Sequence, residues 1–246
     1  MLGIIDWGIG GISIYKLIKE RIGDIGIVYF SDTGVTPYGR MSRPELVARL
    51  KYVISFLKAQ GVTHLVIGCN AASTVIDLID KQGLLIEGVI DCAIDAAIKA
   101  KPTRLGVIGG RRTILSGVYR RAFADRGVRI EQRIAQPLSG LIESGDVSSE
   151  KVHEEAKRIL APLKNCSHIL LACTHYPAIT ALLTEYVSGN TKFIDPAAGV
   201  VKKISTWHLP DSDADEFLTS GEAPAMMKAA GSAFGVTLHP VKKVSP

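Results

Sequence analysis

Short apolar runs rich in isoleucine and valine alternate along the chain with longer segments of helical spacing. Strands buried on both faces of a parallel sheet have this near-continuous apolar character. The pattern predicts strands over Leu2–Asp6, Ile25–Phe30, His64–Cys69, Ile86–Ile90, Arg104–Ile108, Arg129–Ile134, His168–Cys173 and Phe193–Ile194. It predicts helices over Arg43–Gln60, Arg112–Arg126 and Ser149–Leu163, the last capped by Ser148 or Ser149. We expect an α/β fold with mostly parallel sheets covered by helices on both faces.

Three apolar segments recur later in the chain at a nearly constant offset. Leu2–Ile5 aligns with Leu105–Ile108, His64–Cys69 with His168–Cys173, and Ile90–Ala93 with Ile194–Ala197. Three matches in register indicate a duplicated unit. We therefore predict two similar lobes related by pseudo-twofold symmetry, with a first lobe over 1–94, a second over 95–205 and a C-terminal tail over 206–246.

Cys69 and Cys173 end two strands that the repeat makes equivalent. Ligands of open α/β sheets bind beyond the carboxyl ends of the strands. Two lobes that face each other would bring these thiols to opposite sides of one ligand, so that one removes a proton from a carbon and the other delivers one. The alternative, simple packing, is less favoured because polar Asn70 and Thr174 follow the two cysteines. Cys92 and Cys166 lack this setting and are interpreted as packing residues.

Several longer motifs surround these cysteines: Gly3–Gly11, Tyr29–Thr33, Pro37–Gly39, Cys69–Ser73, Cys173–Pro177 and Ile194–Ala197. With them the chain resembles the aspartate/glutamate racemase family over nearly its whole length. The resemblance implies two lobes enclosing an acidic amino acid, with the C-terminal tail packed back on the first lobe. It also implies cofactor-independent racemisation, most simply of L-glutamate to D-glutamate, in which Cys69 acts on the D and Cys173 on the L enantiomer. A cytoplasmic homodimer serving cell-wall peptidoglycan synthesis is part of the same expectation.

The resemblance assigns roles to further residues. Asp6, His175 and Glu143 would orient or tune the thiols, with Asp6 also facing the substrate ammonium; the alternative for Asp6 is capping the next helix. The segment Pro37, Tyr38, Gly39 would receive the side-chain carboxylate on backbone N–H groups, although the same residues also suit an ordinary turn. Asn70, Thr174, Thr113 and Ser116 would hold the α-carboxylate.

Proton transfer at Cα needs one cysteine as thiolate while its partner is a thiol. A thiol has a reference pKa near ~8.5, which a helix N-terminus lowers. Cys69 and Cys173 each precede a segment of helical pattern. We therefore expect helix N-termini to help both cysteines ionise.

Two positions depart from the family pattern. Trp7 stands where the family has serine, and Ala71 where it has threonine. Each lost hydrogen bond to a charged substrate group costs on the order of 1.5–3 kcal/mol. Trp7 would also enter the pocket and offer its aromatic face or fill space. Arg111 and Arg112 are candidates to replace the lost anion contacts, but we favour the interpretation that they are solvated surface arginines. Another isomerase or lyase reaction on a carboxylate, or a non-catalytic binding homologue, therefore stays open.

Composition and charge narrow the classes of protein and of binding partner that remain. The net charge of +5 is spread over short clusters, and 6% aromatic content does not favour nucleic-acid binding. The start of the chain has no secretory pattern, no apolar run reaches the ~20 residues that span a bilayer, and the four cysteines form no CxxC pair. We expect a cytoplasmic protein that does not bind membranes. The loop Gly8–Gly11 lacks the glycine spacing of a nucleotide site, and Cys69, Cys173 and His175 lack zinc-site spacing, so we predict no cofactor and no metal.

Overall fold

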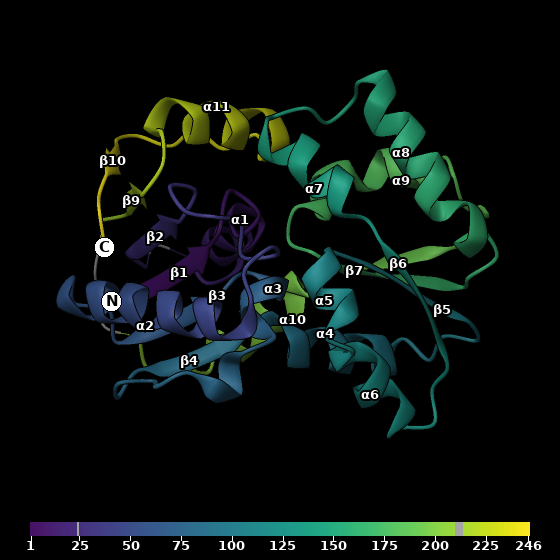
Figure 1. The fold of residues 1–246 in the computed structure, drawn as a ribbon, viewed down its shortest axis with the longest axis horizontal. Coiled ribbons are helices and arrows are strands. Elements are labelled where there is room, and N and C mark those ends of the chain that lie inside the picture. Colours follow the sequence, from purple (N-terminus) through teal and green to yellow (C-terminus); the bar gives the residue numbers. More distant parts are fainter. Residues whose placement is uncertain (24, 210–213) are drawn as a thin grey trace.

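Two parallel sheets, one in each lobe, organise the computed structural model, which describes residues 1–23, 25–209 and 214–246 (Figure 1). The first sheet has the strand order β10-β9-β2-β1-β3-β4 and contains β1 (Leu2–Asp6), β2 (Ile27–Ser31), β3 (His64–Ile67), β4 (Leu85–Gly88), β9 (Glu216–Thr219) and β10 (Val241–Lys243). The second has the order β6-β5-β7-β8 and contains β5 (Leu105–Gly109), β6 (Ile130–Ile134), β7 (His168–Ala172) and β8 (Lys192–Ile194).

The strand register reproduces the sequence repeat. Leu2 of β1 is opposite Ile27 and His64, and Leu105 of β5 is opposite Ile130 and His168. The order β2-β1-β3-β4 thus corresponds to β6-β5-β7-β8. This confirms the expectation of an α/β fold with two similar lobes of mostly parallel sheet.

Helices cover both faces of each sheet. From the first half come α1 (Ile12–Arg21), α2 (Arg43–Ala59), α3 (Asn70–Ser73) and α4 (Val89–Lys99), together with a 3₁₀ turn at Ile76–Leu78. From the second half come α5 (Arg111–Leu115), α6 (Val118–Ala124), α7 (Gln136–Glu143), α8 (Glu150–Leu160), α9 (Thr180–Thr184) and α10 (Ala197–Ile204), with 3₁₀ turns at Ala161–Leu163 and Tyr176–Ile179; α11 (Ala223–Phe234) follows. None of the helices in the described ranges is both long and apolar enough to cross a membrane.

Local sequence explains where the longest helix begins. Ser42 accepts a hydrogen bond from the Glu45 backbone, and the Glu45 carboxylate accepts one from the Ser42 backbone. This capping box satisfies two N–H groups that a helix start leaves without intrahelical partners. From there α2 packs Leu46, Leu50 and other buried residues against the first sheet.

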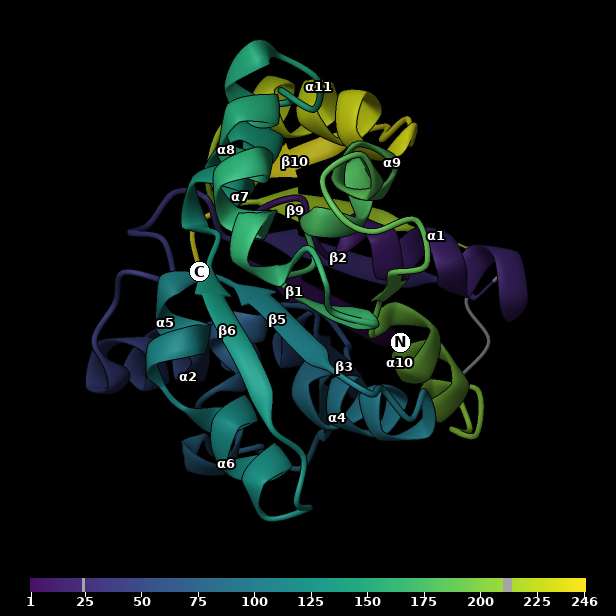
Figure 2. The same ribbon diagram turned by 90° about the vertical axis from the view of Figure 1, so that its right-hand side faces the viewer.

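The last helix after each set of equivalent strands crosses to the other lobe. Helix α4 follows β4 of the first sheet, but its residues Ile90, Ala93 and Ile94 are buried in the core of the second lobe. Helix α10 follows β8 of the second sheet, yet Val200 and Ile204 are buried with α1 in the first lobe. The two helices also contact each other, as Figure 2 shows. They tie the lobes together, and the boundaries at 94/95 and 205/206 stay predictions.

The C-terminal segment adds two strands to the first sheet. Strand β9 pairs with β2, and β10 pairs with β9. Between them, α11 contacts α1 of the first lobe and α7 of the second. The segment therefore reaches both lobes, with α11 near α1 and α7 (Figure 1).

Two element predictions were wrong in detail. The strand expected over Ile86–Ile90 ends at Gly88, because α4 begins at Val89. The helix expected over Arg112–Arg126 is two helices, since Gly117 between them has a φ of 71°, a conformation that favours glycine. Strands β9 and β10 were not predicted, because strands of four and three residues carry little apolar pattern.

Candidate active site

A cavity of about 430 Å³ lies between the lobes, at the carboxyl ends of the central strands β1, β3, β5 and β7. Both cysteines at the equivalent strand ends line it. The wall contains Asp6, Trp7, Pro37, Tyr38, Gly39, Arg40, Cys69, Asn70, Ala71, Gly110, Arg112, Thr113, Gln136, Pro137, Ser139, Gly140, Ala172, Cys173, Thr174 and His175. The duplicated strand ends thus meet in one site, as the sequence predicts.

Cys69 occupies the first-lobe side of the cavity and is 9% exposed. It precedes α3, a helix of a single turn. Burial raises the pKa of Cys69 well above its ordinary value, and the nearby Asp6 charge adds to this rise, although the Ala72 backbone opposes it. The N-terminus of α3 acts in the expected direction through the Ala72 N–H, but burial and the neighbouring carboxylate outweigh it. Cys69 is a thiol in the resting protein.

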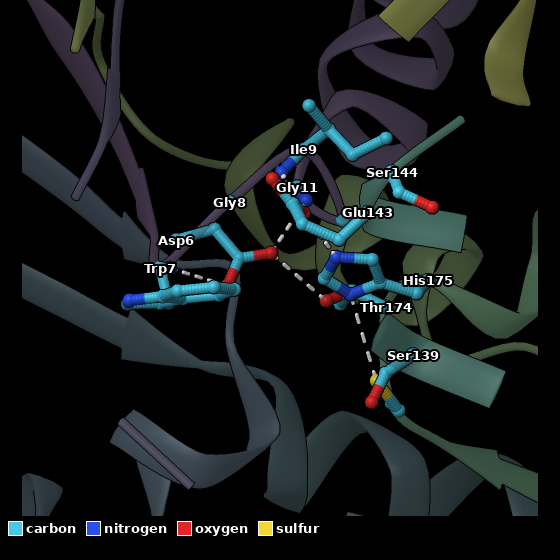
Figure 3. A network of polar contacts seen from close by, with 12 residues as sticks. Asp6, Trp7, Gly8, Ile9, Gly11, Ser139, Glu143, Ser144, Thr174 and His175 are labelled. Carbon is cyan, nitrogen blue, oxygen red and sulfur yellow. Dashed lines mark hydrogen bonds and ion pairs between the residues drawn. The ribbon is translucent and has the colours of Figure 1, made fainter. Parts of the chain in front are cut away.

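Cys173 on the second-lobe side has a different partner. Its sulfur lies 3.6 Å from Nδ1 of His175, whose Nε2 lies 2.6 Å from Oε2 of Glu143 (Figure 3). Burial lowers the pKa of His175, but hydrogen bonds and charges from Cys173 and Glu143 hold the pKa well above its usual value. His175 is therefore an imidazolium at neutral pH. It donates to the Cys173 sulfur, which accepts that bond best as a thiolate.

The Asp6 carboxylate joins the two lobes. It is completely buried and accepts hydrogen bonds from the backbones of Trp7 (2.6 Å) and Gly11 (2.8 Å) and from the Thr174 hydroxyl (3.1 Å) (Figure 3). Burial raises the pKa of Asp6, whereas the positive charge of His175 opposes the rise. The carboxylate thus stands between Cys69 and the imidazolium, in contact with both halves of the site.

The glycine-rich loop after β1 lets these groups approach one another. A Cβ atom on Gly8 would overlap the Glu143 carboxylate, and one on Gly10 would lie 2.6 Å from both Asp6 Oδ2 and His175 Nδ1. The Ile9 backbone N–H also donates to Glu143 Oε2 at 2.9 Å. The loop therefore binds the protein's own carboxylates.

Unpaired polar groups also line the cavity. The Tyr119 hydroxyl donates to Oδ1 of Asn70 at 2.6 Å, which fixes the amide, and Asn70 Nδ2 is buried without a partner in the described part of the chain. Within the same ranges, the backbone N–H groups of Tyr38 and Gly39 have no acceptor. Buried donors of this kind need a partner, and an anionic ligand would supply it.

Trp7 and Ala71 both line the cavity. The Trp7 indole N–H donates to the Val35 carbonyl at 3.1 Å, which holds the ring in the wall. Neither residue offers a hydroxyl to a ligand. The expectation that Trp7 enters the pocket therefore agrees with the geometry.

Two proposed site residues lie outside the cavity wall. Ser116 donates to the Thr113 carbonyl at 2.7 Å and lines a neighbouring cavity, so it does not join Thr113 in this site. Glu143 acts at one remove, through His175. Thr174 lines the cavity but gives its hydroxyl proton to Asp6.

Sequence reasoning missed three kinds of residue. Tyr119 orients Asn70 from a helix of the other lobe, and no local sequence motif predicts that contact. Ser139 and Gln136 line the cavity from α7. Arg112 is half-buried in the cavity wall, whereas we expected a solvated surface side chain. In the three ranges that the structure describes, no group of three His, Cys, Asp or Glu side chains is placed to hold a metal ion.

Fold and site together define a class: a two-lobed α/β protein whose interlobe cavity holds two free cysteines with separate acid/base partners. Comparisons with known proteins agree with that class. The family model described as Asp/Glu/hydantoin racemase matches residues 2–204. The chain therefore belongs to the Asp/Glu/hydantoin racemase family.

Individual relatives match almost the whole chain. A glutamate racemase from Bacillus cereus is 30% identical over 258 residues, covering 99% of this chain and 96% of the relative. One from Thermoanaerobacter sp. is 28% identical over 254 residues with the same two coverages. The crystal structure of a glutamate racemase isoform from Bacillus anthracis aligns with a TM-score of 0.90 at 25% identity, covering 100% of this chain and 97% of the other. The likeness extends through the tail that the family model does not reach.

Proposed function

We propose that this protein racemises an acidic amino acid, most simply glutamate, by moving the Cα proton between two cysteines without a cofactor. The observation that carries the proposal is the convergence of Cys69 and Cys173, at equivalent strand ends, on one cavity. Membership of the racemase family and the full-length similarity to proteins described as glutamate racemases support the substrate.

The surroundings of the two sulfurs differ, and the difference assigns them opposite roles. Cys69 is the acid, because burial and Asp6 raise its pKa. Cys173 is the base, because its sulfur faces the His175 imidazolium at 3.6 Å. The enzyme is thus ready to accept a proton at Cys173 and to donate one from Cys69, which is the direction from L to D that the family resemblance implies.

In that direction the Cys173 thiolate takes the Cα proton of L-glutamate and becomes a thiol. The Cα–H electron pair stays on the substrate as a carbanion, which the Cys69 thiol protonates on the opposite face to give D-glutamate. Cys69 then carries the negative charge. A proton passes from Cys173 to Cys69 through solvent or the neighbouring His175 and Asp6, and the resting state returns.

Binding groups for both carboxylates lie in the same cavity. Asn70 Nδ2 and the Tyr38 and Gly39 N–H groups are donors without a protein acceptor in the described ranges. We assign Asn70 with Thr113 to the α-carboxylate, and the turn at Pro37–Gly39 to the side-chain carboxylate. Asp6 supplies a negative charge near the ammonium.

The test is proton exchange at Cα. Purified protein is incubated with L-glutamate in deuterated water, and circular dichroism and proton NMR follow loss of optical activity and uptake of deuterium. We expect both, with full activity after dialysis against EDTA and without pyridoxal phosphate. A panel of other L-amino acids is the comparison. If no amino acid of the panel loses optical activity or takes up deuterium, the proposal is overturned and a binding homologue is favoured. A change in optical activity without exchange at Cα would indicate another carboxylate reaction.

A cytoplasmic homodimer that supplies D-glutamate for peptidoglycan belongs to the same proposal and rests on the family resemblance. Sedimentation of the purified chain measures its oligomeric state. A monomer at all concentrations would remove the dimer from the proposal without touching the chemistry.

A further inference from the structure

Arg112 lies in the wall of the active cavity and belongs to α5 of the second lobe. It is half-buried, and its guanidinium reaches two segments of the first lobe. Nη1 donates to the Met41 carbonyl at 2.8 Å, and Nε donates to the Thr74 hydroxyl at 3.1 Å. These two bonds fix the position of the head group across the cleft.

The guanidinium has donors to spare and no acidic partner. An arginine carries five N–H donors, and two are used here. Among the residues that the structure describes, none forms a salt bridge with Arg112. Burial lowers its pKa, and the nearby Arg43 charge lowers it further. A partly buried cation without a counter-charge calls for an anionic ligand.

The location of that charge identifies which end of the ligand it faces. Met41, whose carbonyl holds Arg112, ends the turn that begins at Pro37 and presents the unpaired N–H groups of Tyr38 and Gly39. Arg112 and this turn therefore border the same part of the cavity wall.

A second cavity of about 450 Å³, which we call the arginine cavity, shares Arg112 and the neighbouring Gly39 and Arg40 with the active cavity. It is lined by Gly39, Arg40, Arg43, Arg111, Arg112, Leu115 and Ser116. Its wall holds four arginines and no acidic residue, so its potential is positive and favours a negative group in this part of the active cavity.

We propose that Arg112 is a specificity-determining residue that binds the side-chain carboxylate of a dicarboxylic amino acid, in place of the hydroxyl contacts that Trp7 and Ala71 cannot make. The inference rests on the proposed function for its substrate class. Two free N–H groups of a guanidinium match the two oxygens of a carboxylate, and a neutral side chain gains nothing from them.

Glutamate and glutamine separate this role from a structural one, because they are nearly isosteric and differ in charge. Binding of DL-glutamate and DL-glutamine to the whole chain is measured by calorimetry, since racemic ligands are not altered by turnover. We expect wild type to prefer glutamate at least tenfold. Arg112→Gln should raise the Kd for glutamate at least tenfold and leave the Kd for glutamine within threefold, while Arg112→Lys restores part of the preference.

Arg111→Gln is the matched control, because Arg111 neighbours Arg112 in sequence but lines the arginine cavity alone. It should change glutamate affinity less than threefold. An Arg112→Gln protein that loses both ligands equally would show a structural role and overturn the inference, as would a wild type without preference for glutamate.

Turnover distinguishes the two proposals. In Arg112→Gln we expect KM for L-glutamate to rise with kcat within threefold of wild type. If wild type racemises glutamate and Arg112→Gln has the same KM, the proposed role of Arg112 is refuted and the proposed function stands. The opposite result is that wild type prefers glutamate over glutamine, loses this preference in Arg112→Gln, and does not racemise glutamate. It would support the role of Arg112 and refute the proposed function.

Discussion

The two cysteine sites have the same backbone and different chemistry. Strands β1 and β3 place Asp6 and Cys69 as β5 and β7 place Gly109 and Cys173, since the equivalent registers start at Leu2 and Leu105. The register that equates the two cysteines also equates Ala71 with His175. The two sulfurs therefore have neighbours of opposite charge, the Asp6 carboxylate beside Cys69 and the His175 imidazolium beside Cys173.

This difference matters for a reaction that needs one sulfur as acid and the other as base. Two identical surroundings would give both sulfurs the same proton affinity, and a site with two thiols or two thiolates lacks either a base or an acid. The duplicated fold supplies the opposed geometry, and the unequal partners supply the unequal charge. The charge of His175 lowers the pKa of Asp6, so a change of charge in the second lobe alters the pKa of a group in the first.

The largest expected effect comes from removing either sulfur. Cys69→Ala and Cys173→Ala should each lower kcat for racemisation at least about 10³-fold, because general acid/base groups contribute 10²–10⁴-fold and no substitute stands on the same face. Circular dichroism measures the loss. Residual deuterium uptake at Cα is expected for L-glutamate with Cys69→Ala and for D-glutamate with Cys173→Ala.

Cys92→Ala is the control for that pair, since Cys92 is buried in the first lobe and does not line the cavity. It should keep near-normal turnover. Normal activity in either cavity variant would refute the two-thiol mechanism.

A smaller loss of activity should follow when Cys173, like Cys69, has no imidazolium beside it. His175→Gln removes the imidazolium beside Cys173, so we expect kcat/KM to fall by roughly 10²-fold, within the range of one acid/base partner. The fall must be equal for L- and D-glutamate, because the equilibrium constant of a racemisation is one. Kinetics in both directions check it, and Glu143→Gln should give a weaker loss of the same kind. No change in His175→Gln would show that Cys173 does not depend on its partner.

Restoring hydroxyls on the first-lobe side should raise activity about tenfold. Trp7→Ser combined with Ala71→Thr offers two donors near the substrate, and one charge-assisted hydrogen bond is worth roughly 1.4 kcal/mol or more. We expect kcat/KM for L-glutamate to increase, measured against each single change. An unchanged value would mean that the indole and the methyl group are neutral toward glutamate.

The smallest effect concerns stability against pH. The pKa of His175 is raised above 6.5 in the folded protein, so folding gains from the imidazolium fully below about pH 6.5. The gain is lost as the pH rises through the higher folded-state pKa. The Tm difference between wild type and His175→Gln should therefore shrink as the pH rises from 6 upward. A difference that grows with pH would contradict the charge assignment, and Glu143→Gln should remove the same pH-dependent part.

The sequence by itself determined the scaffold and which two cysteines share one cavity. Apolar runs in register reveal parallel strands and their duplication, because strand burial leaves a local pattern. Cys69 and Cys173 could be assigned to one site from the repeat, since the position of a strand end in a parallel sheet fixes its neighbours. Membership in the racemase family, suggested by the motifs around them, follows from the comparisons.

Only the tertiary structure decided the surroundings of those atoms. The raised pKa of Cys69 comes from burial, which depends on residues far away in the chain. Tyr119 holds Asn70, and Arg112 crosses to Met41 and Thr74, through contacts between lobes that no local pattern encodes. Ser116 donates to the Thr113 carbonyl and lines the arginine cavity instead of the active cavity. Strand patterns are local and repeat with the backbone, whereas proton affinity and charge pairing depend on three-dimensional neighbours.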